Sequence, residues 1–262
     1  MGSSQSVNRI SEIETEVKRF YDAYWPSNLP TPEDLDETRR HLRKIVPDNR
    51  WRNALDAGCG LGVCTIALSD WSERVVGLDI SPGSLKSAGE LAQRLGKSNV
   101  EFREGSLMEI PYPDETFDLT LCWGVLMYVP SVERVFGELV RTLRRGGTLV
   151  VAVHRKSALT PVHHAIRHLC LSIPKAAKGA VIKSAARVIR GVSTALGRQP
   201  ARNDLTFEAK VDDFYFIPFK RFFSVTEVQD LFKRHHLSCE LVYNYTGRFK
   251  STSSFIMSGI KS

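Results

Sequence analysis

The chain has 262 residues, of which 42% are hydrophobic and 25% charged, as in one soluble globular domain with an insertion or in two small domains. It has no apolar run long enough to span a bilayer, and its N-terminus does not resemble a signal peptide. We therefore expect neither a membrane-spanning nor a secreted protein. Its five cysteines are scattered without a CxxC pair. This fits a reducing compartment, and we predict a cytoplasmic protein with no disulfide scaffold and no metal site.

One segment carries the basic excess of the chain. The formal net charge is +7, and thirteen of the 36 Lys and Arg residues lie between Glu138 and Asp204, where the sequence has no Asp or Glu. The rest of the chain is therefore net acidic. Such asymmetry indicates an anionic partner, whether a membrane, a nucleic acid or a small acidic substrate.

The N-terminal fifty residues predict two helices. Apolar residues recur at three- and four-residue steps over 7–24, which is typical of an amphipathic helix. Pro26, Pro30 and Pro32 interrupt this pattern, and a second helix is expected over 33–45.

From Trp51 onward, short apolar runs alternate with helical stretches. Strands are expected at 53–57, 74–80, 100–103, 117–123 and 148–154, and helices at 62–70, 84–95 and 131–143. This alternation predicts βαβ units and a parallel, doubly wound sheet. It stops from Arg155 to about Phe222. A helix at 225–235 follows, and then two strands at 238–245 and 253–260 that we expect to form an antiparallel hairpin.

A glycine-rich turn is expected between the first strand and the first helix of this region. Residues 55–62 read Leu-Asp-Ala-Gly-Cys-Gly-Leu-Gly, and glycines at such a place let the backbone approach a nucleotide-like ligand. A tight turn that merely packs is the alternative. Asp79 ends the second strand twenty-one residues after Gly58, where a carboxylate can accept hydrogen bonds from both ribose hydroxyls.

Four ordered blocks of the sequence resemble the Rossmann-like (class I) S-adenosylmethionine-dependent methyltransferases, in the branch that acts on small molecules and lipids. The blocks are residues 55–62, residues 77–81 with Leu85 and Ala88, residues 110–118, and Glu138 with residues 141–147. The resemblance implies an α/β fold: a doubly wound, seven-stranded, mostly parallel sheet with an antiparallel C-terminal strand. It also implies an N-terminal helical lid (1–49), a core (50–154 and 222–262) and an inserted basic helical cap (155–221).

The resemblance further implies that the cofactor is S-adenosylmethionine. The residues that would contact it are Asp56, Gly58, Gly60, Asp79, Ile80, Ser106, Leu107, Cys122 and Trp123. The first three would surround its methionine part, Asp79 would hold the ribose, and Ile80 would lie against the adenine. Relatives often have an Asp where this chain has Ser106, so the charge that meets the adenine amino group is absent there, although the backbone amide of Leu107 remains. Cys122 and Trp123 would flank the cofactor, and for Trp123 a place in the core is the alternative.

Two residues are candidates for the methyl-transfer step. Relatives often carry a His in the loop after the fourth strand, where this chain has Val125-Leu126-Met127-Tyr128. Tyr128 would orient a substrate oxygen. His154, which ends the fifth strand, is the candidate general base, and a rim histidine in water is the alternative.

Four aromatic residues are candidate substrate contacts, with core packing as the alternative. They are Tyr21, Tyr24, Trp25 and Tyr215. The loop after the fourth strand has no Asn/Asp-Pro-Pro-aromatic tetrad, which argues against methylation of exocyclic amines of DNA bases.

The inserted segment predicts a basic amphipathic helix over 175–198. It is either a lid helix with a solvated basic face, an interfacial helix on acidic lipid, or a nucleic-acid contact, the last being the least favoured. We therefore expect methyl transfer from S-adenosylmethionine to an O or N atom of a small-molecule or lipid-linked acceptor, in a cytoplasmic protein with peripheral membrane contact. A non-catalytic cofactor-binding protein that docks a partner or RNA through its basic insertion is the alternative.

Overall fold

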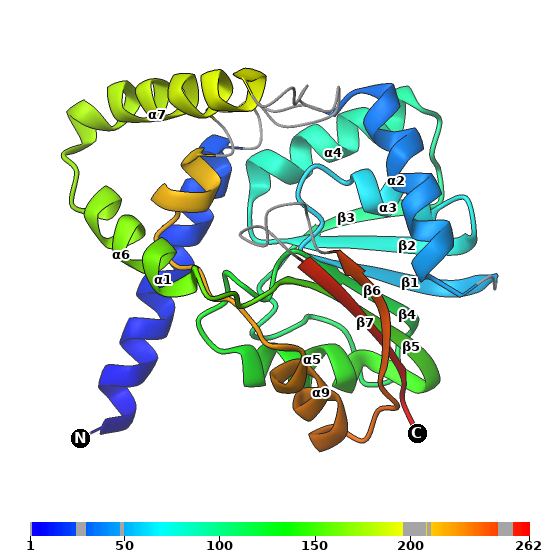
Figure 1. Cartoon of the computed structure of the whole chain (residues 1–262). Helices are drawn as coiled ribbons and strands as arrows, with labels where there is room; N and C mark the ends of the chain where they lie inside the picture. The colour runs from blue at the N-terminus through cyan, green and yellow to red at the C-terminus, as the bar shows by residue number, and fades with distance from the viewer. Residues whose placement is uncertain (1, 25–29, 48–49, 196–207, 209–210, 246–253) are drawn as a thin grey trace. The chain divides into compact units, whose positions relative to one another are not determined.

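The computed structural model describes residues 2–24, 30–47, 50–195, 208, 211–245 and 254–262 (Figure 1). The chain forms two compact units. The core unit comprises Met1–Ser157 and Phe219–Ser262, and the cap unit comprises Ala158–Pro218. Arg155 pairs with Phe223 in a parallel bridge, and the Lys156 amide donates to the Phe223 carbonyl at 2.7 Å, which ties both boundaries of the core unit together.

The core unit is built on a seven-stranded sheet. Its strands are β1 (Trp51–Ala57), β2 (Ser72–Asp79), β3 (Val100–Glu104), β4 (Phe117–Trp123), β5 (Leu143–His154), β6 (Glu240–Tyr245) and β7 (Ser254–Ile260). Their order across the sheet is β3-β2-β1-β4-β5-β7-β6. Neighbouring strands are parallel from β3 to β5, and β7 is antiparallel to both β5 and β6. The predicted seven-stranded, mostly parallel sheet is confirmed.

Helices cover both faces of the sheet (Figure 1). On one face lie α2 (Pro32–Ile45), α3 (Val63–Leu68) and α4 (Pro82–Arg94), whose apolar residues share a cluster with side chains of the central strands. On the other face lie α5 (Val132–Thr142) and α9 (Val225–Arg234), which meet through Phe136 and Phe232 with ring centroids 5.2 Å apart. Helices on both faces explain why β4 is buried along nearly its whole length and is mostly apolar. Its buried Asp118 accepts hydrogen bonds from the amides of Arg52 and Asn53.

Two elements begin five residues before their expected start. Strand β5 begins at Leu143, five residues before the expected start, because Gly146 and Gly147 exchange backbone hydrogen bonds with Lys261. Helix α1 (Gly2–Tyr24) begins earlier than residue 7, at a serine-rich stretch without apolar periodicity.

The cap unit has its own small core. Helix α6 (Thr160–Leu171) and helix α7 (Lys175–Ala195) are followed by a π-helical turn at Asp212–Phe216. Ile182, Ala186, Val211 and Phe216 form the buried cluster. Arg167 is 4% exposed and donates to the carbonyls of Phe214 and Ile217 at 2.8 and 2.7 Å, which holds the π-helical turn against α6.

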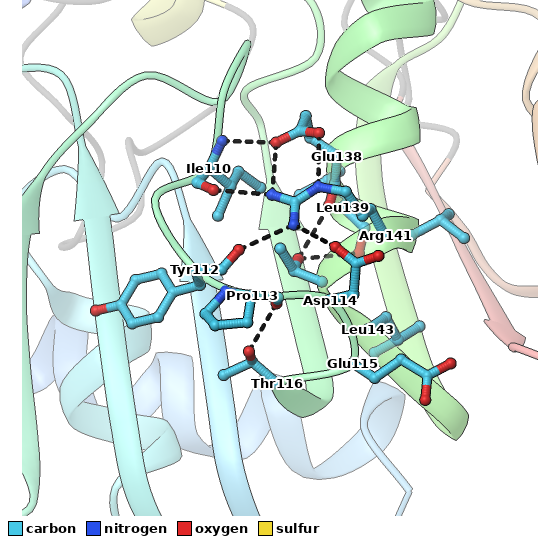
Figure 2. A network of polar contacts seen from close by, with 12 residues as sticks. Ile110, Tyr112, Pro113, Asp114, Glu115, Thr116, Glu138, Leu139, Arg141 and Leu143 are labelled. Atoms are coloured by element: carbon cyan, nitrogen blue, oxygen red, sulfur yellow. Dashed lines mark hydrogen bonds and ion pairs between the residues drawn. The ribbon is translucent and has the colours of Figure 1, made fainter.

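An arginine fastens the loop after β3 to helix α5 (Figure 2). The Arg141 guanidinium donates to both carboxylate oxygens of Glu138, to the carboxylate of Asp114, and to the carbonyls of Ile110 and Tyr112, all within 2.7–2.9 Å. All five N–H groups are thereby used. The depression of about 810 Å³ beside this network therefore offers no spare Arg141 donor to a ligand.

Replacing Arg141 with Met should lower the free energy of unfolding by about 2 kcal/mol, because the change removes charge-assisted bonds and leaves two loop carbonyls without their donor. We expect a Tm about 4–8 °C lower by calorimetry. The matched control is Arg145→Met. That side chain is 79% exposed and lies 3.7 Å from Glu115, so its removal should lower the free energy of unfolding by less than about 0.5 kcal/mol. If the two variants lower the free energy of unfolding equally, the Arg141 network adds no more stability than the exposed Arg145–Glu115 pair.

Candidate cofactor and acceptor site

The strand order reverses between β1 and β4. The chain runs outward from β1 to β2 and β3, and then returns to β4 on the other side of β1. In open α/β sheets, ligands bind at the carboxyl ends of the strands at this switch point. The glycine turn, Asp79 and His154 all lie at that edge, at the ends of β1, β2 and β5.

The turn after β1 requires glycine at position 58. Gly58 has φ +81°, and a Cβ added there would lie 2.4 Å from a Val125 methyl carbon. The amides of Gly58 and Cys59 both donate to the Leu78 carbonyl of β2, at 2.7 and 3.1 Å. The turn is therefore packed between the end of β2 and the loop after β4.

Asp79 closes this turn from the end of β2. One carboxylate oxygen accepts from the Gly60 amide at 2.8 Å and the other from the Ser81 amide at 2.9 Å. Burial raises the pKa of Asp79, and these two amide bonds oppose the rise. The partly buried Ile80 follows it at the same edge.

Asp56 lies inside β1 and is 1% exposed. The Thr65 hydroxyl donates to its carboxylate at 2.6 Å. Burial raises the pKa of Asp56 to about 7, and the nearby negative charge of Asp79 adds to the rise. A cation placed beside Asp56 would favour its ionised form.

The other proposed cofactor contacts follow β3 and end β4. Ser106 and the buried Leu107 come directly after Gly105, which pairs through its amide with the Asp79 carbonyl. Cys122 is fully buried, and burial raises the pKa of its thiol to about 12, so it stays protonated. Trp123 packs on the apolar cluster and meets the His41 ring at 5.3 Å, which are contacts of a core aromatic. Its place beside a cofactor stays a prediction.

The loop after β4 brings three polar side chains together. Tyr128 is 8% exposed, and its hydroxyl accepts a hydrogen bond from the Lys220 ammonium at 3.1 Å. Lys220 is itself only 5% exposed. The His154 amide contacts the Met127 sulfur at 3.2 Å, and its imidazole stacks on Phe222 at 6.3 Å. Burial, helped by the charge of Lys220, lowers the pKa of His154 to about 3. His154 is therefore neutral at physiological pH.

Lys220 was missed by the sequence analysis. It lies in a segment that resembles no known motif, and no spacing connects it with Tyr128, ninety-two residues away in the chain. The one signal available was its position directly after the aromatic-rich segment 214–219.

The candidate substrate contacts fall into different parts of the structure. Tyr21 of α1 packs edge-on against Tyr128, with centroids 5.7 Å apart. Tyr215 belongs to the cap unit, where its hydroxyl lies 3.1 Å from the His163 imidazole. Trp25 and the side chain of Tyr24 lie outside the described residues.

The raised pKa of Asp56 predicts how stability depends on pH. The pKa is about 7 in the folded protein and about 4 in the unfolded chain, so the folded state holds a proton that the unfolded state has released. As the pH rises from 5 to 8, the free energy of unfolding of the wild type should therefore fall by about 2–3 kcal/mol relative to that of Asp56→Asn. The Asn amide oxygen can still accept the hydrogen bond from Thr65. Urea unfolding at several pH values measures this. Exposed Asp36→Asn is the control, and parallel curves for wild type and Asp56→Asn would contradict the shift.

Comparison with known proteins agrees with this geometry. A family model described as a methyltransferase domain matches residues 55–151. Ajmaline N-methyltransferase from Rauvolfia serpentina is 32% identical over 46% of this chain and 42% of its own length. Phosphatidylethanolamine N-methyltransferase from Cereibacter sphaeroides is 34% identical over 46% of this chain and 59% of its own length. The chain thus spans about half the length of these curated relatives.

A solved structure supports the fold over a longer stretch. The YcgJ protein from Bacillus subtilis matches with a TM-score of 0.60 at 16% sequence identity, over 86% of this chain and 98% of its own. Together with this fold, the family match identifies residues 55–151 as a methyltransferase domain, with the glycine turn and Asp79 at the switch point of its sheet.

Proposed function

We propose that the protein transfers a methyl group from S-adenosylmethionine to an O or N atom of a small-molecule or lipid-linked acceptor. The observation that carries the proposal is the division of one sheet edge into two parts. Carboxylates and the glycine turn lie at the ends of β1 and β2, and a Tyr-Lys-His cluster lies beside the ends of β4 and β5. The first part suits a cationic nucleoside, and the second suits a polar acceptor.

The residues at β1 and β2 fit the cofactor chemically. Asp79 offers carboxylate oxygens where ribose hydroxyls would donate, and Asp56 is a buried acid whose ionised form a sulfonium would stabilise. When bound, S-adenosylmethionine supplies an activated methyl group on a good leaving group. The protein then has mainly to align the acceptor and exclude water.

The Tyr-Lys-His cluster would prepare the acceptor. A positive charge on Lys220 favours the deprotonated form of a nearby hydroxyl or amine, as it favours neutral His154. Neutral His154 can accept a hydrogen bond from the acceptor, and Tyr128 can fix the position of an acceptor oxygen. Because the pKa of His154 is about 3, we assign it the role of a weak base; the charge of Lys220 lowers its basicity but also favours loss of the acceptor proton.

The names of relatives support this range of acceptors. They include ajmaline N-methyltransferase, phosphatidylethanolamine N-methyltransferase and demethylmenaquinone methyltransferases from Listeria. We therefore retain both the small-molecule and the lipid-linked classes.

We further propose that the cap unit rests on an acidic membrane surface through α7, which would make the protein peripheral to a membrane. Lys183 and Arg187 are exposed on this helix, and Val188 and Val192 are 66% and 55% exposed beside them. Two other basic residues of the expected face are paired within the cap unit, Lys178 with Asp212 and Arg190 with Glu208. None of the described helices is long and apolar enough to cross a bilayer.

The methyl-transfer proposal is tested with methyl-labelled S-adenosylmethionine and a panel of phenols, amines and phosphatidylethanolamine vesicles. With an accepted hydroxyl substrate, His154→Ala should lower kcat about 10²-fold, at the lower end of general-base effects, because the imidazole is a weak base. The wild-type rate should not fall between pH 8 and 6 through His154, which stays neutral there. Exposed His168→Ala is the control. A loss below tenfold would limit His154 to a structural role, and cofactor binding without turnover on any acceptor would favour the non-catalytic alternative.

The membrane proposal is tested by co-sedimentation with vesicles. Binding should rise with the anionic lipid fraction and fall with salt, since each nearby Lys or Arg contributes about 1 kcal/mol. Changing Lys175, Lys183 and Arg187 to Glu should abolish it. Changing Lys44, Lys86 and Lys233 to Glu alters the net charge equally on the core unit and should leave most binding intact. Wild-type protein that stays in the supernatant with acidic vesicles at low salt would contradict the proposal.

A further inference from the structure

Helix α1 presents a row of polar side chains to the edge of the sheet that carries the glycine turn and Asp79. Glu14, Lys18 and Asp22 are spaced one helical turn apart and therefore share one face. Glu14 meets Ser106 after β3, Lys18 meets Glu104 at the end of β3, and Asp22 accepts from the Ser81 hydroxyl after β2 at 2.6 Å. All three contacts are with residues at the carboxyl ends of β2 and β3.

The hydroxyl of Ser106 already takes part in two hydrogen bonds in this arrangement. It donates its single proton to one carboxylate oxygen of Glu14 and accepts from the Met108 amide at 3.0 Å. A serine hydroxyl has one proton and two lone pairs, whereas a carboxylate offers about four acceptor positions. Glu14, which comes from α1, is therefore a stronger acceptor than Ser106. The other carboxylate at the end of β3, that of Glu104, is paired with Lys18.

The sheet order indicates which part of the cofactor reaches this place. The glycine turn lies at β1, Asp79 at β2 and Ser106 directly after β3, and these three strands are neighbours in that order. A nucleoside whose ribose is held by Asp79 extends its base away from the glycine turn, toward β3. The adenine edge carries a 6-amino group, which donates hydrogen bonds, and a carboxylate is its best partner.

We propose that Glu14 of α1 accepts a hydrogen bond from the adenine 6-amino group, so that helix α1 determines specificity for the adenine base. The inference rests on the use of S-adenosylmethionine and is independent of the methyl acceptor. It makes α1 part of the cofactor site, and cofactor binding in turn favours the docked position of α1.

The test compares two ligands that differ only in the base. Calorimetry measures the Kd of S-adenosylhomocysteine and of S-inosylhomocysteine, in which a 6-oxo group replaces the 6-amino group. The wild type should prefer the adenine ligand by about tenfold or more, as a charge-assisted bond implies. Glu14→Ala should reduce this preference to less than about threefold. Glu14→Gln should also shift the preference toward the 6-oxo ligand, because the amide can donate to it, and a merely structural role would not produce that shift.

Two control variants separate base recognition from general effects. Glu16→Ala removes an exposed carboxylate from the same helix and should keep the wild-type preference. Asp79→Asn should weaken the binding of both ligands to a similar degree, because both contain the same ribose. If Glu14→Ala weakens both ligands equally, or leaves both unchanged, the role of Glu14 in base recognition is refuted. If the wild type binds neither ligand, the cofactor assignment itself fails.

Discussion

The loop from Gly124 to Tyr128 contacts both the glycine turn and the Tyr-Lys-His cluster. Val125 fills the space beside Gly58, so the turn after β1 can have no side chain at that position. The Gly124 amide donates to Ala152 of β5, and the Met127 carbonyl accepts from Arg221 at 2.8 Å. Tyr128 then meets Lys220 and Tyr21. One five-residue loop thus joins the nucleoside end of the edge to the acceptor end. A shift in this loop would move both, because its neighbours are close-packed on each side.

Acidic groups and the basic Lys220 lie at opposite ends of this edge. Asp79 and Asp56 are enclosed at the ends of β2 and β1, and burial raises the pKa of both. At the β5 end, burial together with the charge of Lys220 holds His154 neutral. A cationic cofactor is favoured on the acidic side, whereas an acceptor beside Lys220 is favoured in the form that has lost its proton. This order of charge suits the pairing of an electrophilic cation with a neutral or anionic nucleophile.

The features that were predictable from sequence are those carried by local patterns. The alternation of apolar runs indicated the sheet, and Asp79 stood at a fixed distance from the glycines at the end of a recognisable strand. Lys220 and Glu14 have no such local signal, because each meets its partner, Tyr128 and Ser106 respectively, only through tertiary packing across about ninety residues. The early start of β5 depends on pairing with Lys261, which periodicity around residue 143 does not reveal. The neutral state of His154 likewise follows from burial and from the charge of Lys220, which lies far from it in the sequence.

The interior position of strand β7 affects how the chain folds during its synthesis. It is synthesised after β6 but lies inside it, paired with β5 from Thr148 to His154 on one side and with β6 on the other. Until residues 254–260 leave the ribosome, the edge of β5 has no partner and presents open backbone donors and acceptors. The growing chain must therefore keep this edge from pairing with other chains. Chains that lack residues 254–260 would lose an interior strand of the sheet and should therefore aggregate, whereas loss of an edge strand would be tolerated.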